Sequence, residues 1–212
     1  MSVKHEMFNC QPNSNKSKYG VYSKFNIDTG ILRFYLGDSK KTGIQEHQYC
    51  SMLSISPTIT TSHRIKLWDL GRTLTDLEHW RLMGCSDDDY GKISHMKSSR
   101  IMKMIGNSIP VNLLECIFGK MLRGGYMSET LRVIELFSGY GSQAMALRNL
   151  GINHEVVAIS EFDEIPAKAY EAIHGHCPNL GDITKIKVED LPDSDLITFS
   201  FPCQSYFSSA MM

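Results

Sequence analysis

A cysteine that follows an apolar, strand-like run is the residue with the clearest potential for chemistry in this chain. Cys203 stands between Pro202 and Gln204, directly after the predicted strand 196–201. Catalytic groups in parallel α/β sheets lie at the carboxyl ends of strands. A free cysteine has a pKa near ~8.5, so its site must lower that pKa or remove the proton before the thiolate can attack. A lone cysteine here would be a small buried apolar residue, but its neighbours and the motifs upstream favour a nucleophile.

A glycine-rich turn upstream has the composition of a ligand-binding loop. Its sequence is Phe137-Ser138-Gly139-Tyr140-Gly141-Ser142, where glycines let the backbone approach a ligand closely. Glu161 follows the next predicted strand and can accept hydrogen bonds from ribose hydroxyls, and Asp182 lies further on. These residues predict an adenosine-containing cofactor of either the nicotinamide or the methionine type. The full Gly-x-Gly-x-x-Gly pattern is not present, because Ala144 occupies its last position.

Strands and helices alternate through the last part of the chain, and this alternation positions both motifs. Apolar, β-prone runs predict strands, and helical spacing of apolar residues predicts helices. The predicted elements are the strand 131–137, the helix 143–150, the strand 155–160, the helix 164–173 and the strand 196–201. Strands joined by helices form right-handed βαβ units in a parallel sheet, so we expect a doubly wound α/β fold.

The chain upstream of this part predicts helices and a β-rich region. Thr75 and Glu78 form a capping box that predicts a short helix, and Pro110 suits the first turn of a second helix. The stretch 123–130 contains a Gly-Gly pair and is expected to be a linker. Residues 1–70 mix polar residues with short β-prone pieces, which predicts a loop-rich β region.

Together these motifs resemble, in order and approximate spacing, the opening of C5-cytosine DNA methyltransferases, especially phage and prophage types. The resemblance implies a Rossmann-like methyltransferase sheet, S-adenosyl-L-methionine as the cofactor and double-stranded DNA as the partner. It also implies a catalytic segment formed by Pro202, Cys203 and Gln204, in which the cysteine adds to cytosine C6 and makes C5 electron-rich enough to take a methyl group.

The same resemblance assigns cofactor-binding roles. Phe137 would pack on the adenine, Glu161 would hold the ribose, and Asp182 would bind the adenine amino group. The cofactor-binding residues implied in this part of the chain are Phe137, Ser138, Gly139, Gly141, Ser142, Glu161, Phe162, Asp182 and Ile183.

Two segments upstream resemble the last two motifs of the same family, so the chain looks circularly permuted. These are 72–84 and 105–111. In the second, Asn107 and Ser108 would complete the cofactor pocket. The expected layout is a partial target-recognition region at 1–70, C-terminal-type methyltransferase motifs at 71–122, the linker at 123–130, and the cofactor-binding and nucleophile half at 131–212.

Parts of the family pattern have no match in the sequence. There is no Glu-Asn-Val segment, whose glutamate would hydrogen-bond cytosine N3, and no Arg-x-Arg after it. We therefore expect an incomplete enzyme, with a second polypeptide or a truncated gene product as the two explanations. Two other functions stay open: a non-catalytic S-adenosylmethionine-binding or interaction fragment, and a relative that methylates RNA cytosine.

Charge is unevenly distributed along the chain. The net charge of -1 combines residues 1–126, with 17 basic and 11 acidic side chains, and residues 127–212, with 5 and 12. The basic part could face nucleic-acid phosphates, although no run of more than two consecutive basic residues exists. Ordinary surface charge with a chance asymmetry explains the same numbers.

Cysteine and apolar patterns bound the setting of the protein. The six cysteines are scattered without a Cys-x-x-Cys pair, so free thiols in a reducing compartment are expected. His174, His176 and Cys177 have no second cluster to complete a ligand set, so no metal is expected. The sequence opens without a signal-peptide pattern and has no long uninterrupted apolar stretch, which predicts a cytoplasmic protein that uses no membrane.

Overall fold

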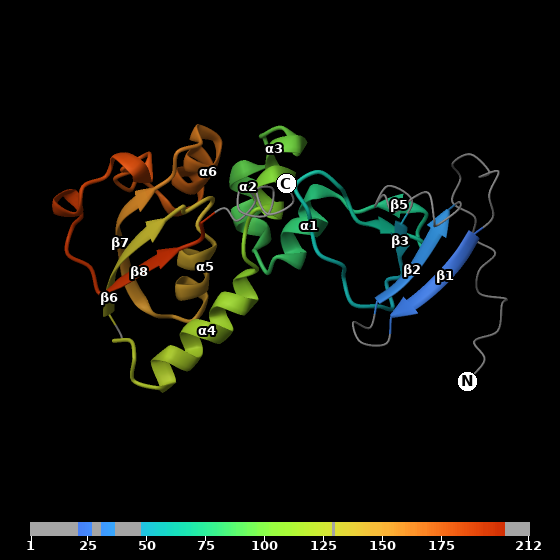
Figure 1. Ribbon diagram of the computed structural model, residues 1–212, viewed down its shortest axis with the longest axis horizontal. Coiled ribbons are helices and arrows are strands. Elements are labelled where there is room, and N and C mark those ends of the chain that lie inside the picture. The colour runs from blue at the N-terminus through green and yellow to red at the C-terminus, as the bar shows by residue number, and fades with distance from the viewer. Residues whose placement is uncertain (1–20, 27–30, 37–47, 129, 202–212) are drawn as a thin grey trace, which may run out of the picture. The chain divides into compact units, whose positions relative to one another are not determined.

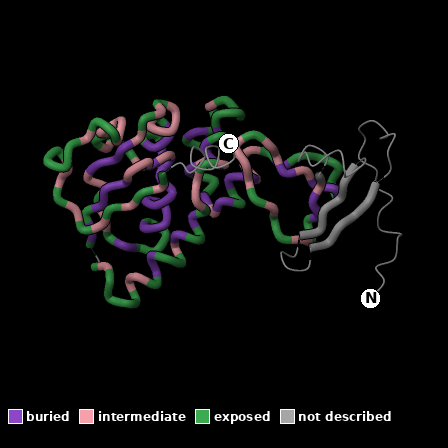
Figure 2. The backbone as a smooth tube through the Cα atoms, viewed as in Figure 1, coloured by how far each residue is buried: buried purple, intermediate pink, exposed green. Residues whose placement is uncertain are grey.

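The chain forms two compact units, unit 1 at Met1–Thr75 and unit 2 at Asp76–Met212. The computed structural model describes residues 21–26, 31–36, 48–128 and 130–201. Unit 1 contains strands and loops, whereas unit 2 combines helices with a parallel sheet (Figure 1). Buried residues in unit 2 concentrate on the sheet and on the helices packed against it (Figure 2).

Unit 1 is built on a five-stranded sheet with the order β1-β2-β3-β4-β5. Its strands are β1 Val21–Asn26, β2 Ile31–Leu36, β3 Gln48–Cys50, β4 Lys66–Leu67 and β5 Arg72–Thr73. Neighbouring strands are antiparallel except β3 and β4, which are parallel. Cys50, Ile65, Leu67 and Leu74 form a small buried cluster, and Ile59 packs against it. The predicted β-rich character of this region is confirmed.

Four helices open unit 2: α1 Asp76–Leu82, α2 Asp87–Ile93, α3 Ser98–Gly106 and α4 Val111–Arg123. The predicted capping-box helix and the helix at Pro110 are confirmed as α1 and α4. The helices α2 and α3 were not predicted. Of the two, α2 is short and acidic and has little apolar periodicity. A local signal for α2 does exist, since the hydroxyl of Ser86 caps it by accepting from the backbone N–H of Asp89 at 3.1 Å.

A three-stranded parallel sheet with the order β7-β6-β8 forms the rest of unit 2 (Figure 1). Its elements are β6 Thr130–Leu136, α5 Ser142–Asn149, β7 Asn153–Ser160, α6 Glu164–His174, the 3-10 helices η3 Ile183–Lys185 and η4 Val188–Asp190, and β8 Leu196–Phe199. The predicted alternation of strands and helices and the parallel α/β class are confirmed. The carboxyl ends of all three strands therefore meet at one edge, where the predicted motifs follow them.

A buried glutamate places α5 and α6 on the same face of this sheet. Glu135 of β6 is fully buried, and its Oε1 accepts from the backbone N–H of Ala144 in α5 at 2.9 Å. Its Oε2 accepts from the hydroxyl of Tyr170 in α6 at 2.6 Å. Burial raises the pKa of Glu135 to about 7, although both hydrogen bonds act to lower it. The carboxyl group therefore connects the strand to both helices by hydrogen bonds.

The other face of β8 carries exposed apolar side chains. Thr198 is in register with Glu135, so Ile197 and Phe199 point away from α5 and α6. These two side chains are 48% and 64% exposed. Within the described residues, this face of β8 is left largely uncovered.

A buried aspartate ties the upstream helices to the α/β part. Asp89 of α2 is 2% exposed and forms ion pairs with Arg148 of α5 and with Lys92. Burial raises the pKa of Asp89, but the hydrogen bonds from Arg148 and Ser86, together with the nearby positive charges, lower it by more. The net pKa therefore lies below its usual range. Lys92 also donates to the carbonyl of Ile173 in α6 at 2.9 Å. The helical segment and the sheet therefore form one folding unit.

One apolar run, Ser98–Arg123, is long and apolar enough by composition to cross a membrane. In the structure it forms α3 and α4, which are interrupted where Pro110 follows the end of α3. Both helices bury apolar side chains within unit 2, including Ile105 and Val111. Packing inside this unit accounts for part of the apolar character of the run, whereas Leu113 and Ile117 of α4 stay exposed.

We expect Glu135→Gln to change how stability depends on pH. The folded chain holds the Glu135 proton up to a pKa of about 7, whereas an ordinary glutamate releases it near 4.5. The free energy of unfolding should therefore fall by on the order of 3 kcal/mol as pH rises between these values. In the Glu135→Gln variant this fall should be absent, because glutamine does not titrate. Urea unfolding of both proteins at pH ~5 and pH ~8 measures it. The same pH dependence in the two proteins would contradict this account.

Candidate functional site

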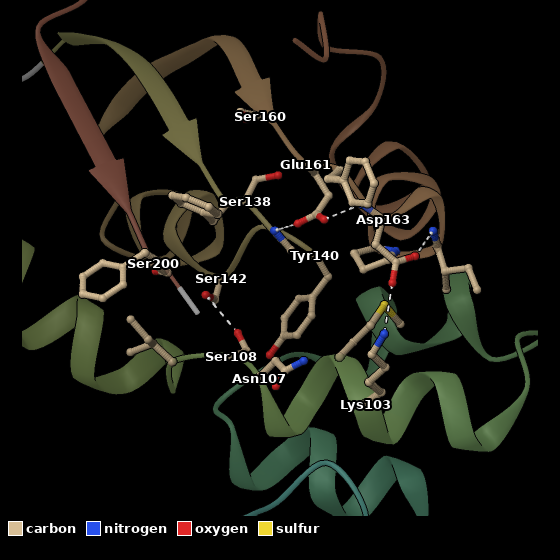
Figure 3. Close-up of a pocket in the computed structure, with 18 of the residues that line it drawn as sticks. Lys103, Asn107, Ser108, Ser138, Tyr140, Ser142, Ser160, Glu161, Asp163 and Ser200 are labelled. Atoms are coloured by element: carbon tan, nitrogen blue, oxygen red, sulfur yellow. Dashed lines mark hydrogen bonds and ion pairs between the residues drawn. The ribbon is translucent and has the colours of Figure 1, made fainter. Parts of the chain in front are cut away.

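A cavity of about 480 Å³ opens where β6, β7 and β8 end. Its lining comes from both parts of unit 2, namely α3 with the segment after it and the loops that follow the parallel strands (Figure 3). The volume falls in the range of small-molecule and cofactor sites. The position is also the one at which open parallel sheets bind ligands.

The turn between β6 and α5, residues 137–141, forms one wall through an unusual backbone conformation. Phe137, Gly139 and Gly141 have positive φ angles of 55°, 58° and 84°. A left-handed conformation costs a residue with a Cβ about 1–2 kcal/mol, so Phe137 is strained. The N–H of Gly141 donates to the carbonyl of Ser138 at 2.9 Å and closes the turn. Strain of this kind is concentrated at functional sites.

The second glycine of the turn is required by close packing against α6. A Cβ on Gly141 would overlap Nε2 of His174 and would lie 2.7 Å from a ring carbon of Tyr170. Nε2 of His174 donates to the carbonyl of Tyr140 at 3.1 Å. Burial lowers the pKa of His174 to about 4, so the ring is neutral at pH ~7 and keeps its proton for this bond. The end of α6 thus fixes the path of the turn.

Tyr140 anchors the same turn to the upstream helices. Its side chain is 1% exposed, and its ring centroid lies 4.7 Å from that of Trp80 in α1. Its hydroxyl lies 3.8 Å from Sγ of Cys85 and also hydrogen-bonds Ser108. Burial raises the pKa of the Cys85 thiol to about 12, so this cysteine is a neutral packing group.

A fixed carboxylate stands at the end of β7. Glu161 accepts from the backbone N–H of Gly139 at 2.9 Å and from that of Asp163 at 2.8 Å (Figure 3). Asp163 is itself paired with Lys103 of α3 at 3.1 Å. Phe162, beside the carboxylate, lines the cavity and is 77% exposed. A carboxylate held in one orientation beside an open apolar ring can accept hydrogen bonds from vicinal hydroxyls.

Asp182 and Ile183 reach the cavity from the loop after α6. Oδ1 of Asp182 accepts from the N–H of Thr184 at 3.0 Å and from its hydroxyl at 2.8 Å, which caps η3. These hydrogen bonds lower the pKa of Asp182. The carboxylate is therefore ionised at neutral pH and has a defined position at the cavity edge.

Hydroxyl groups dominate the polar lining near the turn. Asn107 and Ser108, between α3 and α4, line the cavity, and Oγ of Ser108 donates to Oγ of Ser142 at 3.2 Å (Figure 3). Ser138 also lines it and is 3% exposed, yet its hydroxyl has no hydrogen-bond partner among the described residues. Buried polar groups are normally satisfied, so a ligand with a polar group there would fit.

The structure brings most of the predicted cofactor-binding residues to this one cavity. Those that line it are Phe137, Ser138, Gly139, Ser142, Glu161, Phe162, Asp182, Ile183, Asn107 and Ser108. Gly141 lies instead behind the wall, against α6. The predicted catalytic residues Pro202, Cys203 and Gln204 lie outside the described residues, although Ser200 and Phe201 just before them line the cavity.

Several lining residues were not part of the sequence-based prediction. Arg100, Lys103 and Met104 come from α3, Gln143 comes from the start of α5, and Ser200 directly follows β8. The position of Gln143 next to the glycine-rich turn is a signal that could have found it. The α3 residues carry no such signal, because their role depends on how α3 packs.

The histidines and cysteine considered as metal ligands have separate partners. His174 bonds to the turn, and His176 pairs with Glu171 at 3.3 Å. Sγ of Cys177 donates to a backbone carbonyl at 3.2 Å. In the part of the chain that the structure describes, no group of three or more such side chains could hold a metal ion.

Comparison with known proteins gives one family and several relatives. The family model described as C-5 cytosine-specific DNA methylase matches residues 3–123 and 131–211. The chain is 45% identical over 78 residues to the orphan methyltransferase M.SPBetaI of Bacillus phage SPbeta, covering 36% of this chain and 18% of that protein. It is 38% identical over 76 residues to the type II methyltransferase M.HhaI of Haemophilus parahaemolyticus, covering 36% and 22%. The aligned part thus spans about a fifth of the length of these relatives.

The two glycines of the turn should respond differently to alanine. At Gly139 a Cβ meets no atom of the described residues within 4 Å, so only the positive φ opposes it there, at a cost of about 1–2 kcal/mol. At Gly141 the same cost is joined by overlap with His174 and Tyr170. We expect Gly141→Ala to lower the free energy of unfolding by roughly 2 kcal/mol more than Gly139→Ala, measured by denaturant titration. Similar losses would show that α6 does not constrain the turn.

Proposed function

The chain belongs to the C-5 cytosine-specific DNA methylase family, and we propose that it carries the cofactor pocket and the nucleophile of an enzyme that methylates C5 of cytosine in double-stranded DNA. The observation that carries this proposal is the cavity that gathers Glu161, Asp182 and the β6–α5 turn at the ends of parallel strands. The names of the relatives, phage orphan and type II methyltransferases, support the same reaction class.

S-adenosylmethionine fits the groups that line the cavity. Glu161 would accept the two ribose hydroxyls, because its carboxylate is already oriented by backbone N–H groups. Phe137, Phe162 and Ile183 supply apolar surface for an adenine ring, and Asp182 supplies an acceptor for its amino group. The hydroxyl of Ser138, which has no partner among the residues that the structure describes, would gain one from a polar group of the ligand. When bound, the cofactor supplies a methyl group activated by its sulfonium.

Cys203 is the proposed nucleophile. Its thiolate would add to C6 of cytosine, so that a carbon–sulfur bond forms as the C5–C6 π bond breaks and its electron pair moves to C5, which can then accept a methyl group. Loss of the C5 proton would then restore the double bond and expel the cysteine. The support is positional, since Ser200 lines the cavity only three residues before it. Pro202 and Gln204 complete the catalytic segment.

We also propose that the chain is a circular permutation of the family pattern. Residues 71–122 would carry the C-terminal-type motifs and 131–212 the cofactor and nucleophile motifs, joined by the connector 123–130. The family match falls in two stretches that leave out residues 124–130, which supports this layout. Lining residues from before and after the connector share one cavity, as the layout requires. Residues 1–70 would be part of a target-recognition region.

A second polypeptide would complete the enzyme. The sequence contains no Glu-Asn-Val segment to hydrogen-bond cytosine N3. The face of β8 that the described residues leave uncovered, with Ile197 and Phe199 exposed, offers apolar surface on which further structure could pack. The missing glutamate matters because nothing else identified in this chain would stabilise the intermediate formed by attack at C6.

We expect Glu161→Gln to weaken S-adenosylmethionine binding by about tenfold or more, because hydrogen bonds to a charged acceptor contribute about 1.5–3 kcal/mol. Isothermal titration calorimetry on the purified chain measures the affinity. Glu164→Gln is the matched control, since Glu164 is exposed on α6 and its carboxylate pairs with Lys168. Equal affinities in Glu161→Gln and the wild type would remove Glu161 from the site.

Methyl transfer by the chain alone should be very slow. Purified chain incubated with DNA and radiolabelled S-adenosylmethionine should label the DNA no faster than a Cys203→Ser variant does. The reason is that the partner group for cytosine N3 is missing. Rapid labelling that depends on Cys203 would contradict the need for a second polypeptide while supporting the nucleophile.

A further inference from the structure

A continuous chain of polar side chains runs along one part of the cavity wall. Oγ of Ser108 lies 3.2 Å from Oγ of Ser142, and Ser142 lies 3.2 Å from Oε1 of Gln143. Nε2 of Gln143 then lies 2.8 Å from Oγ of Ser200. This row of hydrogen bonds therefore links the segment after α3, the start of α5 and the segment after β8. Its central member, Gln143, is 3% exposed.

The amide of Gln143 sets the direction of all three hydrogen bonds in this row. An amide NH₂ only donates and an amide oxygen only accepts, whereas a hydroxyl can do both. Ser200 must therefore accept from Gln143, and Ser142 must donate to it. Because the proton of Ser142 is used, Ser108 must be the donor to Ser142.

This direction gives two hydroxyls opposite characters towards the cavity. Ser200 has accepted a hydrogen bond and keeps its own proton, so it can donate to a ligand. Ser142 already donates its only hydroxyl proton to Gln143. It can therefore offer only a lone pair to a ligand and accept a hydrogen bond from it. The pair suits a ligand end that carries both an acceptor such as a carboxylate and a donor such as an ammonium group.

The opposite end of the cavity is suited to a nucleoside. Glu161 provides a fixed acceptor for ribose hydroxyls there. Figure 3 shows Ser200, Ser142 and Ser108 grouped together, apart from Glu161. A ligand with a nucleoside at one end and an amino acid at the other would satisfy both ends of the lining.

We propose that Gln143 is a positioning residue that orients the amino-acid end of S-adenosylmethionine, with Ser200 donating to its carboxylate and Ser142 accepting from its ammonium group. The inference rests on the proposed function and adds to it a residue that controls the polarity of the site. Gln143 acts through the two serines, so its replacement alters recognition of the amino-acid end and leaves recognition of the nucleoside intact.

The test compares two ligands that differ in the amino-acid end. S-adenosylhomocysteine has this end, and 5′-methylthioadenosine lacks it. Gln143→Glu keeps the shape of the side chain but replaces the amide donor by a carboxylate oxygen, so Ser200 must donate to the new carboxylate and loses its free proton. We expect about tenfold weaker calorimetric binding of S-adenosylhomocysteine and less than about a twofold change for 5′-methylthioadenosine.

Two further comparisons decide between a role in recognition and a role in folding alone. Ser200→Ala removes only the proposed donor and should give the same selective loss, which also covers the case in which Gln143→Glu does not fold. Equal loss of both ligands, or no loss of either, in a folded variant would overturn the role of Gln143. A wild-type chain that binds neither ligand would overturn the proposed function and this inference with it.

Discussion

The left-handed turn between β6 and α5 is the constraint on which the rest of unit 2 depends. Gly141 can hold this conformation because it has no Cβ, and the contact with His174 and Tyr170 leaves no room for one. The turn in turn directs Ser142 and Ser138 towards the cavity and lets Glu161 bond to its backbone. A sharper or looser turn would separate these groups. The arrangement of the site therefore depends on how the turn packs on α6.

The turn also joins two parts of the chain that lie on either side of a connector. Tyr140 packs on Trp80 of α1, and Asp89 of α2 pairs with Arg148 of α5. The upstream helices therefore complete the core of the α/β part as well as one wall of the cavity. This shared core agrees with the proposed permutation, because what matters for folding is which surfaces meet and not which one comes first in the sequence.

Much of this arrangement could be predicted from the sequence, for reasons that differ between elements. The strands and helices after residue 130 have clear apolar periodicity, and Glu161 and Asp182 follow from their position after predicted elements. The helix α2 is too short and acidic to have such a pattern. The hydrogen-bond chain through Gln143 depends on the buried orientation of one amide, which no local pattern specifies. The predictions for Pro202, Cys203 and Gln204 lie outside the described residues and stay predictions.

The central claim is that residues from both sides of the connector enclose one S-adenosylmethionine site. A crystal structure of the chain grown with S-adenosylhomocysteine tests it most directly. The account predicts a ligand in the cavity with its ribose at Glu161 and its amino-acid end at Ser142 and Ser200, in contact with the segment after α3. A ligand bound elsewhere, or an empty cavity at saturating ligand, would contradict the account.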